Sequence, residues 1–281
     1  MPIFSPLIVD PAVQGFRLTT ETGVAVSTTN QTAKTSVFIT PYNGANIALC
    51  NGTAGQWYYL TMQAQATVAL GTVVSGRPYD VFAYNSGGTL AGEILAWSST
   101  TARATAVTLT NGVYLKSGDL TRRLVGTLYT TSTTQTIDTD ERRFVVNVDN
   151  VVDRKLYSYN TDGSWNYSTA SYRESNGGTG QVRAEWVQPL AGPTYLVEGS
   201  QNINGTSSGA RWAAGFKLTN TVTGKSAFTN ANGITLNMTS QGFITPAVGY
   251  NWVTMIEYVD GGTATYSGTE GGGACYVHIK C

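Results

Sequence analysis

Short runs in which apolar and polar residues alternate recur along the whole chain, and Asn-Gly or Asp-Gly pairs separate many of them. Alternation with a period of two is typical of a strand that has one buried face. Within residues 106–116, Val107 and Leu109 precede Asn111-Gly112, and Val113 and Leu115 follow it. Asn tolerates a positive φ and Gly adopts one freely, so this pair can close a tight turn. The pattern predicts a β-hairpin.

A second alternating segment, residues 252–267, surrounds Asp260-Gly261-Gly262 and predicts another hairpin.

Residues 274–281 predict a final strand. A period of two assigns Cys275, Val277, Ile279 and Cys281 to one face of that strand, and Tyr276, His278 and Lys280 to the other. Cys275 and Cys281 are then roughly 20 Å apart, too far for a disulfide. The cysteines are interpreted as small core residues.

No segment carries a sustained helical stripe with caps, and the best helix candidate, residues 98–107, is short and rich in threonine. We therefore predict an all-β protein with an occasional helical turn.

A shift to polar composition after residue 150 indicates a domain boundary between 150 and 180. The expected order is an N-terminal arm (1–15), a β-rich scaffold domain (16–160), a linker (161–180) and a β-sandwich or jelly-roll-like domain (181–281).

Charge narrows the set of partners. Charged residues make up 12% of the chain, against about 25% in typical proteins, and the formal net charge is zero. This balance argues against nucleic acid and anionic membranes as partners. No apolar stretch approaches the roughly 20 residues of a membrane span, and the first residues do not form a secretion leader, so we expect a protein made and kept in a cytoplasm. Low surface charge also favours self-association.

Nucleophilic catalysis would have to use His278, the only histidine. In a regular strand His278 points away from Cys275 and Cys281, and Cys50 belongs to the other expected domain. We interpret His278 as a ring that faces solvent or an interface. No catalytic residue is predicted.

For metals, the nearest set of oxygen ligands is the acidic run at Asp138, Asp140 and Glu141. Arg142 and Arg143 follow it at once, so we interpret the run as a solvated turn with its charge balanced. No metal or cofactor is predicted.

Two carboxylates beside aromatic rings keep glycan hydrolysis open as a less favoured alternative. Glu185 adjoins Trp186, and Glu257 lies near Trp252 and Tyr258. Aromatic rings could instead bind carbohydrate without cleaving it. The candidates are Trp165, Tyr167, Tyr172, Trp186, Trp212 and Trp252. Large rings dominate β cores, so no single one is assigned as a ligand-binding residue.

A series of motifs between residues 16 and 175 resembles a family of phage and prophage virion proteins, described mainly as tail or structural proteins. The motifs occupy residues 16–29, 36–49, 79–84, 111–118, 121–131, 142–144 and 164–173. The sequence departs from the family pattern after Phe144, where Val145-Val146-Asn147 and the following residues replace the Trp-Asn that many members carry.

The resemblance implies a β-rich scaffold on the particle surface, without catalytic residues. We therefore expect a non-enzymatic virion protein, a tail fibre or spike appendage involved in host attachment, made in the cytoplasm of the bacterial host. The resemblance also implies a homotrimer that contacts other phage structural proteins, with a host surface glycan as a candidate further partner. A capsid decoration or head-fibre protein is the alternative, and a glycan-degrading tailspike is third.

Overall fold

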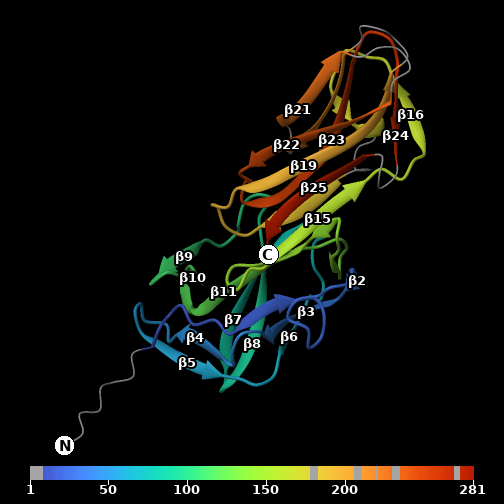
Figure 1. The fold of residues 1–281 in the computed structure, drawn as a ribbon. Helices are drawn as coiled ribbons and strands as arrows, with labels where there is room; N and C mark the ends of the chain where they lie inside the picture. The colour runs from blue at the N-terminus through green and yellow to red at the C-terminus, as the bar shows by residue number, and fades with distance from the viewer. Residues whose placement is uncertain (1–8, 178–182, 206–210, 219–220, 230–234, 269–272) are drawn as a thin grey trace, which may run out of the picture. The chain divides into compact units, whose positions relative to one another are not determined.

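The computed structural model describes residues 9–177, 183–205, 211–218, 221–229, 235–268 and 273–281, with the backbone alone for the strand residues between 205 and 234. The chain divides into two units, both built of strands (Figure 1). The first takes in residues up to Asp138, Phe144–Val152 and Cys281, and the second takes in Thr139–Arg143 and Asp153–Lys280. The fold is therefore all-β, as the alternating pattern predicts.

The first unit contains two main antiparallel sheets, with strand orders β1-β3-β6 and β8-β7-β11-β10-β9, and β14 pairs with β11. Two short ladders, β4-β5 and β2-β12, complete it. The strands are β1 (Phe16–Thr19), β2 (Gln31–Lys34), β3 (Ser36–Pro41), β4 (Asn46–Cys50), β5 (Trp57–Thr61), β6 (Ala66–Ala69), β7 (Pro78–Ser86), β8 (Thr89–Ala96), β9 (Val107–Thr110), β10 (Val113–Lys116), β11 (Asp119–Tyr129), β12 (Thr136–Asp138) and β14 (Val145–Asn147).

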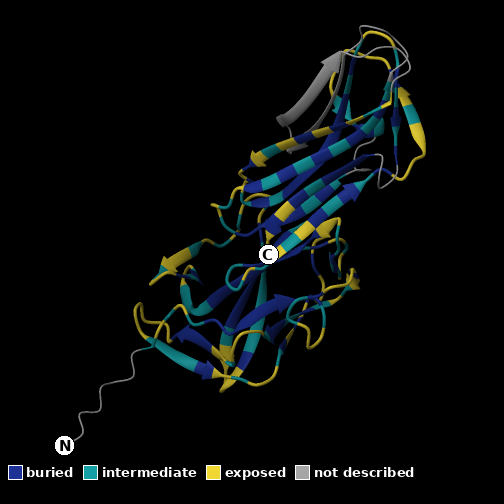
Figure 2. Ribbon diagram, viewed as in Figure 1, coloured by how far each residue is buried: buried dark blue, intermediate teal, exposed yellow. Residues whose placement is uncertain are grey.

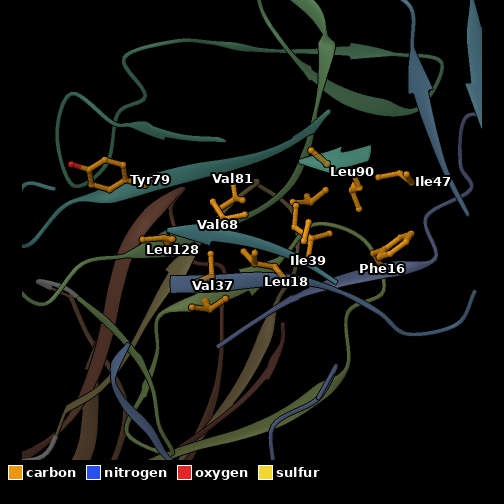
Figure 3. Close-up of a cluster of buried hydrophobic side chains, with 14 of the residues drawn as sticks. Phe16, Leu18, Val37, Ile39, Ile47, Val68, Tyr79, Val81, Leu90 and Leu128 are labelled. Atoms are coloured by element: carbon orange, nitrogen blue, oxygen red, sulfur yellow. The ribbon is translucent and has the colours of Figure 1, made fainter. Parts of the chain in front are cut away.

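Alternate residues of these strands form the core of the first unit. Leu18 of β1, Val37 and Ile39 of β3 and Val81 of β7 are buried and belong to one apolar cluster (Figure 3). Gly126 of β11 packs so closely that an added Cβ would lie 2.5 Å from the carbonyl oxygen of Val146. Only glycine fits at that position.

The predicted hairpin at Asn111 is confirmed. Asn111 and Gly112 both have positive φ, 50° and 81°, and join β9 to β10. Thr110 pairs with Val113, and this register places Leu109 and Leu115 on different faces of the ladder. Leu115 is buried, whereas Leu109 is 57% exposed. The apolar residues before and after the turn therefore lie on opposite faces of the ladder.

The second unit is a sandwich of two sheets. The first sheet has the order β13-β18-β23-β20-β21 with β17 beside β23, and the second has the order β15-β25-β19-β24-β16 with β22 beside β19. Its elements are β13 (Arg142–Arg143), β15 (Asp153–Tyr159), β16 (Ser164–Tyr167), β17 (Arg173–Glu174), β18 (Arg183–Gln188), β19 (Tyr195–Gly205), β20 (Arg211–Leu218), β21 (Thr221–Thr229), β22 (Thr235–Ile244), β23 (Gly249–Asp260), β24 (Ala264–Ser267) and β25 (Gly273–Lys280), with a 3₁₀ turn at Ser175–Gly177.

Side chains from the two sheets meet between them. Trp186 of β18 is fully buried, and its ring centroid lies 6.2 Å from that of Tyr195 of β19. All seven residues of β15 pair with β25, and β16 pairs with β24. Because of these ladders, residues 153–177 lie in the second unit, whereas the sequence assigned them to the end of the scaffold domain and to the linker.

The final strand has the predicted faces. Cys275, Val277 and Ile279 of β25 are buried, while His278 and Lys280 are exposed, and Cys50, Cys275 and Cys281 are all free thiols. Figure 2 shows this alternation of buried and exposed residues as bands along the strands of the second unit. Burial raises the pKa of the Cys275 thiol, which favours its neutral form.

The hairpin predicted around Asp260-Gly261-Gly262 is wrong. Strands β23 and β24 do form on either side, but they belong to different sheets. β18 and β17 pair with β23 along one edge and β20 pairs with it along the other. Both edges of β23 are occupied, so the chain crosses to the opposite sheet and β24 pairs with β16 and β19.

Residues 98–107 form a turn and the start of β9, not a helix. Across the described ranges the only helical element is the 3₁₀ turn at Ser175–Gly177, and no helix there has the length and apolarity to cross a membrane.

Two motifs of the first unit supply buried polar contacts. Asp80 accepts hydrogen bonds from Arg103 at 2.6 and 3.0 Å and from the Thr127 hydroxyl at 2.7 Å. Arg123 donates to the carbonyl oxygens of Pro11, Val13 and Ala48 at 2.9, 2.9 and 3.0 Å, and to Asp149 at 3.0 Å. These side chains hold loops and strands together, so the motifs that carry the family resemblance include determinants of the fold.

Candidate functional site

His278 lies where the sequence places it, on the exposed face of β25. Its Nε2 atom is 3.7 Å from a carboxylate oxygen of Glu198. Cys275 and Cys281 are buried, and Cys275 belongs to the opposite face of the same strand. The structure does not bring the histidine to a cysteine of β25.

The acidic run does not form a ligand set. Asp140 pairs with Arg143 at 2.5 Å, whereas Arg142 pairs with Glu185. Asp138 is buried in the β2-β12 ladder of the first unit. Among the residues that the structure describes, no three His, Cys, Asp or Glu side chains are grouped closely enough to hold a metal ion.

Glu257 lies inside the sandwich and is 1% exposed. Its carboxylate accepts hydrogen bonds from Trp165 Nε1 at 2.6 Å and from the guanidinium of Arg173. Burial raises the pKa of Glu257, because removal from water penalises the charged form more than the two donors stabilise it. The carboxylate joins β16 of one sheet to β17 and β23 of the other.

Glu185 lies on the other face of its sheet. It pairs with Arg142 at 2.5 Å and accepts a hydrogen bond from the Tyr250 hydroxyl. Glu185 pairs with Trp252, which precedes Glu257 by five residues on β23. The side chains of Glu185 and Glu257 therefore project from opposite faces of the sheet and are offset by roughly 17 Å along the strands. A glycosidase pair needs a separation of about 5 to 10 Å across one cleft. Glu185 and Glu257 do not form such a pair.

Most candidate aromatic rings pack within the second unit. Trp186 and Tyr167 are buried, Trp165 stacks on Tyr266 at 5.9 Å, and the Arg183 guanidinium covers Trp252 at 3.9 Å. Tyr172 is 38% exposed and contacts Tyr258. The side chain of Trp212 lies outside the described residues. None of these rings lines a hollow described in the structure.

A different group of tyrosines lies on the outer surface of the second sheet. Tyr157 and Tyr159 of β15 and Tyr276 of β25 are half-buried. Tyr157 is 6.2 Å from Tyr159 and 6.0 Å from Tyr276 between centroids, with interplanar angles of 10° and 23°. The Lys155 ammonium lies over the Tyr157 and Tyr276 rings, at 4.7 and 4.4 Å. The ammonium therefore covers one face of each of these two rings.

Polar side chains continue this surface. The register aligns Tyr157, Tyr276, Glu198 and Gln241 in one row across β15, β25, β19 and β22. Gln241 Nε2 donates to Glu198 at 2.6 Å. A hollow of 190 Å³ is lined by Tyr276 together with Glu198, Ser200, Thr239 and Gln241. We call this surface the tyrosine face. Its residues are Tyr157, Tyr159, Tyr276, Lys155, Glu198, Gln241 and His278.

The tyrosine face combines flat apolar rings with hydrogen-bond donors and acceptors. Rings of this kind bury apolar area at little cost in side-chain entropy, which makes tyrosine effective in binding surfaces. Among its described residues the face holds neither a nucleophile paired with a base nor two facing carboxylates.

Sequence reasoning missed the tyrosine face. Tyr276 and His278 were assigned to the polar side of the last strand, but their partners on β15 are more than a hundred residues earlier. The available signal was the alternation Lys155, Tyr157, Tyr159, which places two rings on the solvent side of a strand.

A larger hollow, 520 Å³, lies in the first unit between Gln14, Asn43, Asn46, Asp149 and Asn150. It has no aromatic lining, and several of its polar groups bind one another or the chain. Asn43 donates to Asn150, Asn150 donates to the Phe16 carbonyl, both at 3.0 Å, and Asp149 binds Arg123. These contacts are those of a loop junction.

No family model matches the sequence, and no curated protein matches it. Solved structures match distantly, and jelly-roll β proteins are among them. They include Eiger TNF from S. frugiperda (10% identity, 46% of this chain and 91% of that chain, TM-score 0.31), infectious bursal disease virus VP2 in a subviral particle (10%, 89% and 65%, 0.33) and the C-terminal CBM6 of LamC from Zobellia galactanivorans (14%, 45% and 100%, 0.23). The likeness concerns β architecture alone.

Proposed function

We propose that this chain is a non-enzymatic structural protein of a bacteriophage particle, a tail fibre or spike appendage that takes part in host attachment. The observation that carries the proposal is the tyrosine face, a cluster of aromatic, charged and amide side chains on the outer surface of the second unit. An appendage that binds its host needs such a surface. It does not need a reaction.

The first unit fits a scaffold role. Five of the motifs that resemble phage virion proteins over residues 16–175 lie in this unit, and side chains in them, Asp80, Arg123 and Gly126, make buried structural contacts. Residues used in this way stabilise a domain. In the proposal this unit docks on the particle and the second unit binds the host, in a homotrimer.

Blocking the second unit tests the attachment role. A monovalent antibody fragment that binds the tyrosine face should slow adsorption of particles to host cells, because it covers the surface proposed to meet the host. A fragment against the major capsid protein is the control and should leave the rate unchanged. Adsorption at the same rate with either fragment would contradict a role in attachment and would favour capsid decoration.

A further inference from the structure

We infer that two copies of this chain associate through β22, whose outer edge pairs antiparallel with β22 of the second copy around a two-fold axis. The pairing joins the second sheets of the two copies into one continuous sheet. The inference goes beyond the proposed function, because a two-fold contact is not the three-fold contact of a homotrimer. In a trimeric protein it would link one trimer to another.

Strand β22 lies at the edge of the second sheet. It pairs with β19 from Tyr195 opposite Ile244 to Asn204 opposite Thr235, without a shift in register. β25 and β24 occupy the other side of β19. In the part of the chain that the structure describes, no other strand pairs with β22 (Figure 1). An edge strand of this kind presents a row of backbone N–H and C=O groups that can pair with a strand of another molecule.

The two edges of this sheet differ in how they are protected. On the opposite edge, β15 begins with the charged residues Asp153, Arg154 and Lys155. The Tyr157 amide of the same strand donates to the carbonyl oxygen of Asp140 at 2.7 Å. Charged side chains and a covering segment both keep an edge from pairing with another molecule. β22 contains no charged residue and no proline, and its ladder with β19 has no bulge.

The side chains of β22 favour a second copy as the partner. All of them are neutral, so self-pairing brings no like charges together, and a charged foreign segment finds no opposite charge here. The chain as a whole has no net charge to keep its copies apart. Phe243 is 76% exposed, the highest value for a large apolar side chain among the described residues. An exposed apolar ring on an uncharged edge adds a reason for the edge to be covered.

Symmetry restricts the register of the pair. Residues directly opposite each other in an antiparallel pair lie on the same face of the sheet. A two-fold axis perpendicular to the sheet keeps the outer faces of both copies on one side, so the axis passes through a residue and not between two. With the axis at Thr239, this residue lies opposite Thr239 of the second copy, and Asn237 lies opposite Gln241. Hydroxyl then meets hydroxyl, and amide meets amide.

Disulfide crosslinking of the purified full chain tests this register. Opposite Cα atoms of an antiparallel pair are about 4.5 to 5.5 Å apart, within disulfide reach. Thr239→Cys should therefore give a covalent dimer under mild oxidation. Thr235→Cys is the matched control, an exposed threonine of the same strand whose two copies would lie roughly 27 Å apart, and it should stay uncrosslinked. The natural cysteines, Cys50, Cys275 and Cys281, are buried and should not contribute.

Thr239→Lys tests the association without a crosslink. Two ammonium groups would meet at the axis, so the dissociation constant of the two-fold contact should rise about tenfold or more. Sedimentation at a series of concentrations measures this constant. Thr108→Lys is the control, because Thr108 is an exposed threonine of β9, an edge strand of the first unit. It should associate like the original chain.

Three results would overturn the inference. They are the absence of a crosslink with Thr239→Cys, equal crosslinking of Thr239→Cys and Thr235→Cys, and equal association of Thr239→Lys and the original chain. These measurements use the purified chain, whereas attachment is measured on particles and host cells. Failure of the two-fold contact would therefore leave the proposed function standing, and slowed adsorption would not rescue the two-fold contact.

Discussion

Replacing Arg123 by alanine should lower the free energy of unfolding of the first unit by about 3 to 5 kcal/mol, the range for removing one member of a buried charged network. The guanidinium is 1% exposed and donates to three carbonyl oxygens as well as to Asp149. Without it, the carbonyls of Pro11 and Ala48 lose their bond to Arg123. Burial lowers the pKa of Arg123, which reflects the cost of keeping this charge out of water.

The adjacent residue supplies the control. Arg122 is partly exposed, and its guanidinium lies over the Tyr84 ring at 3.9 Å and pairs with Glu93 at 3.3 Å. Arg122→Ala should cost about 1 kcal/mol or less. Amide hydrogen exchange in β4 and β11 reports the first unit separately from the second. Equal protection in the two variants would show that Arg123 does not hold the segment at Pro11 and Val13.

Glu257→Gln should flatten the pH dependence of stability in the second unit. The pKa of Glu257 is raised in the folded state above its ordinary value of 4.5, so the folded unit binds more protons than the unfolded chain between the two values. The contribution of Glu257 is fully present below pH 4.5 and is lost as pH rises through the raised pKa. The glutamine side chain of the variant cannot ionise. As pH rises through that window, the free energy of unfolding of the variant should therefore increase relative to that of the original chain.

Glu257→Ala separates charge from structure. It removes the acceptor for Trp165 Nε1 and for Arg173, so we expect a loss of about 1 to 3 kcal/mol at neutral pH. Denaturant unfolding followed by hydrogen exchange in β23 measures both variants. A stability difference between Glu257→Gln and the original chain that is independent of pH would mean that the carboxylate keeps an ordinary pKa.

The all-β class was predictable because its signals are local. Asn111-Gly112 sets the turn and even the register of β9 and β10, and the last strand has the faces that its alternation predicts. The failure at Asp260-Gly261-Gly262 has a non-local cause. Whether β23 pairs with β24 depends on the strands that already occupy its two edges, and those come from β17, β18 and β20.

The candidate site was harder to predict for the same reason. Trp165 and Trp186 attract attention as large rings, yet they pack inside the second unit, while smaller tyrosines on β15 and β25 come together only through the pairing of distant strands. Arg123 also gives no warning of its burial, since arginine is usually exposed. Long-range pairing decides both cases.

The location of the chain on the particle distinguishes a tail appendage from a capsid protein. Purified particles would be imaged with an antibody fragment bound to this protein, and the position of the added density would be recorded. We predict added density at the tail. Density spread over the capsid lattice would contradict attachment and make the chain a decoration protein, and particles that carry no density at all would contradict its place in the virion.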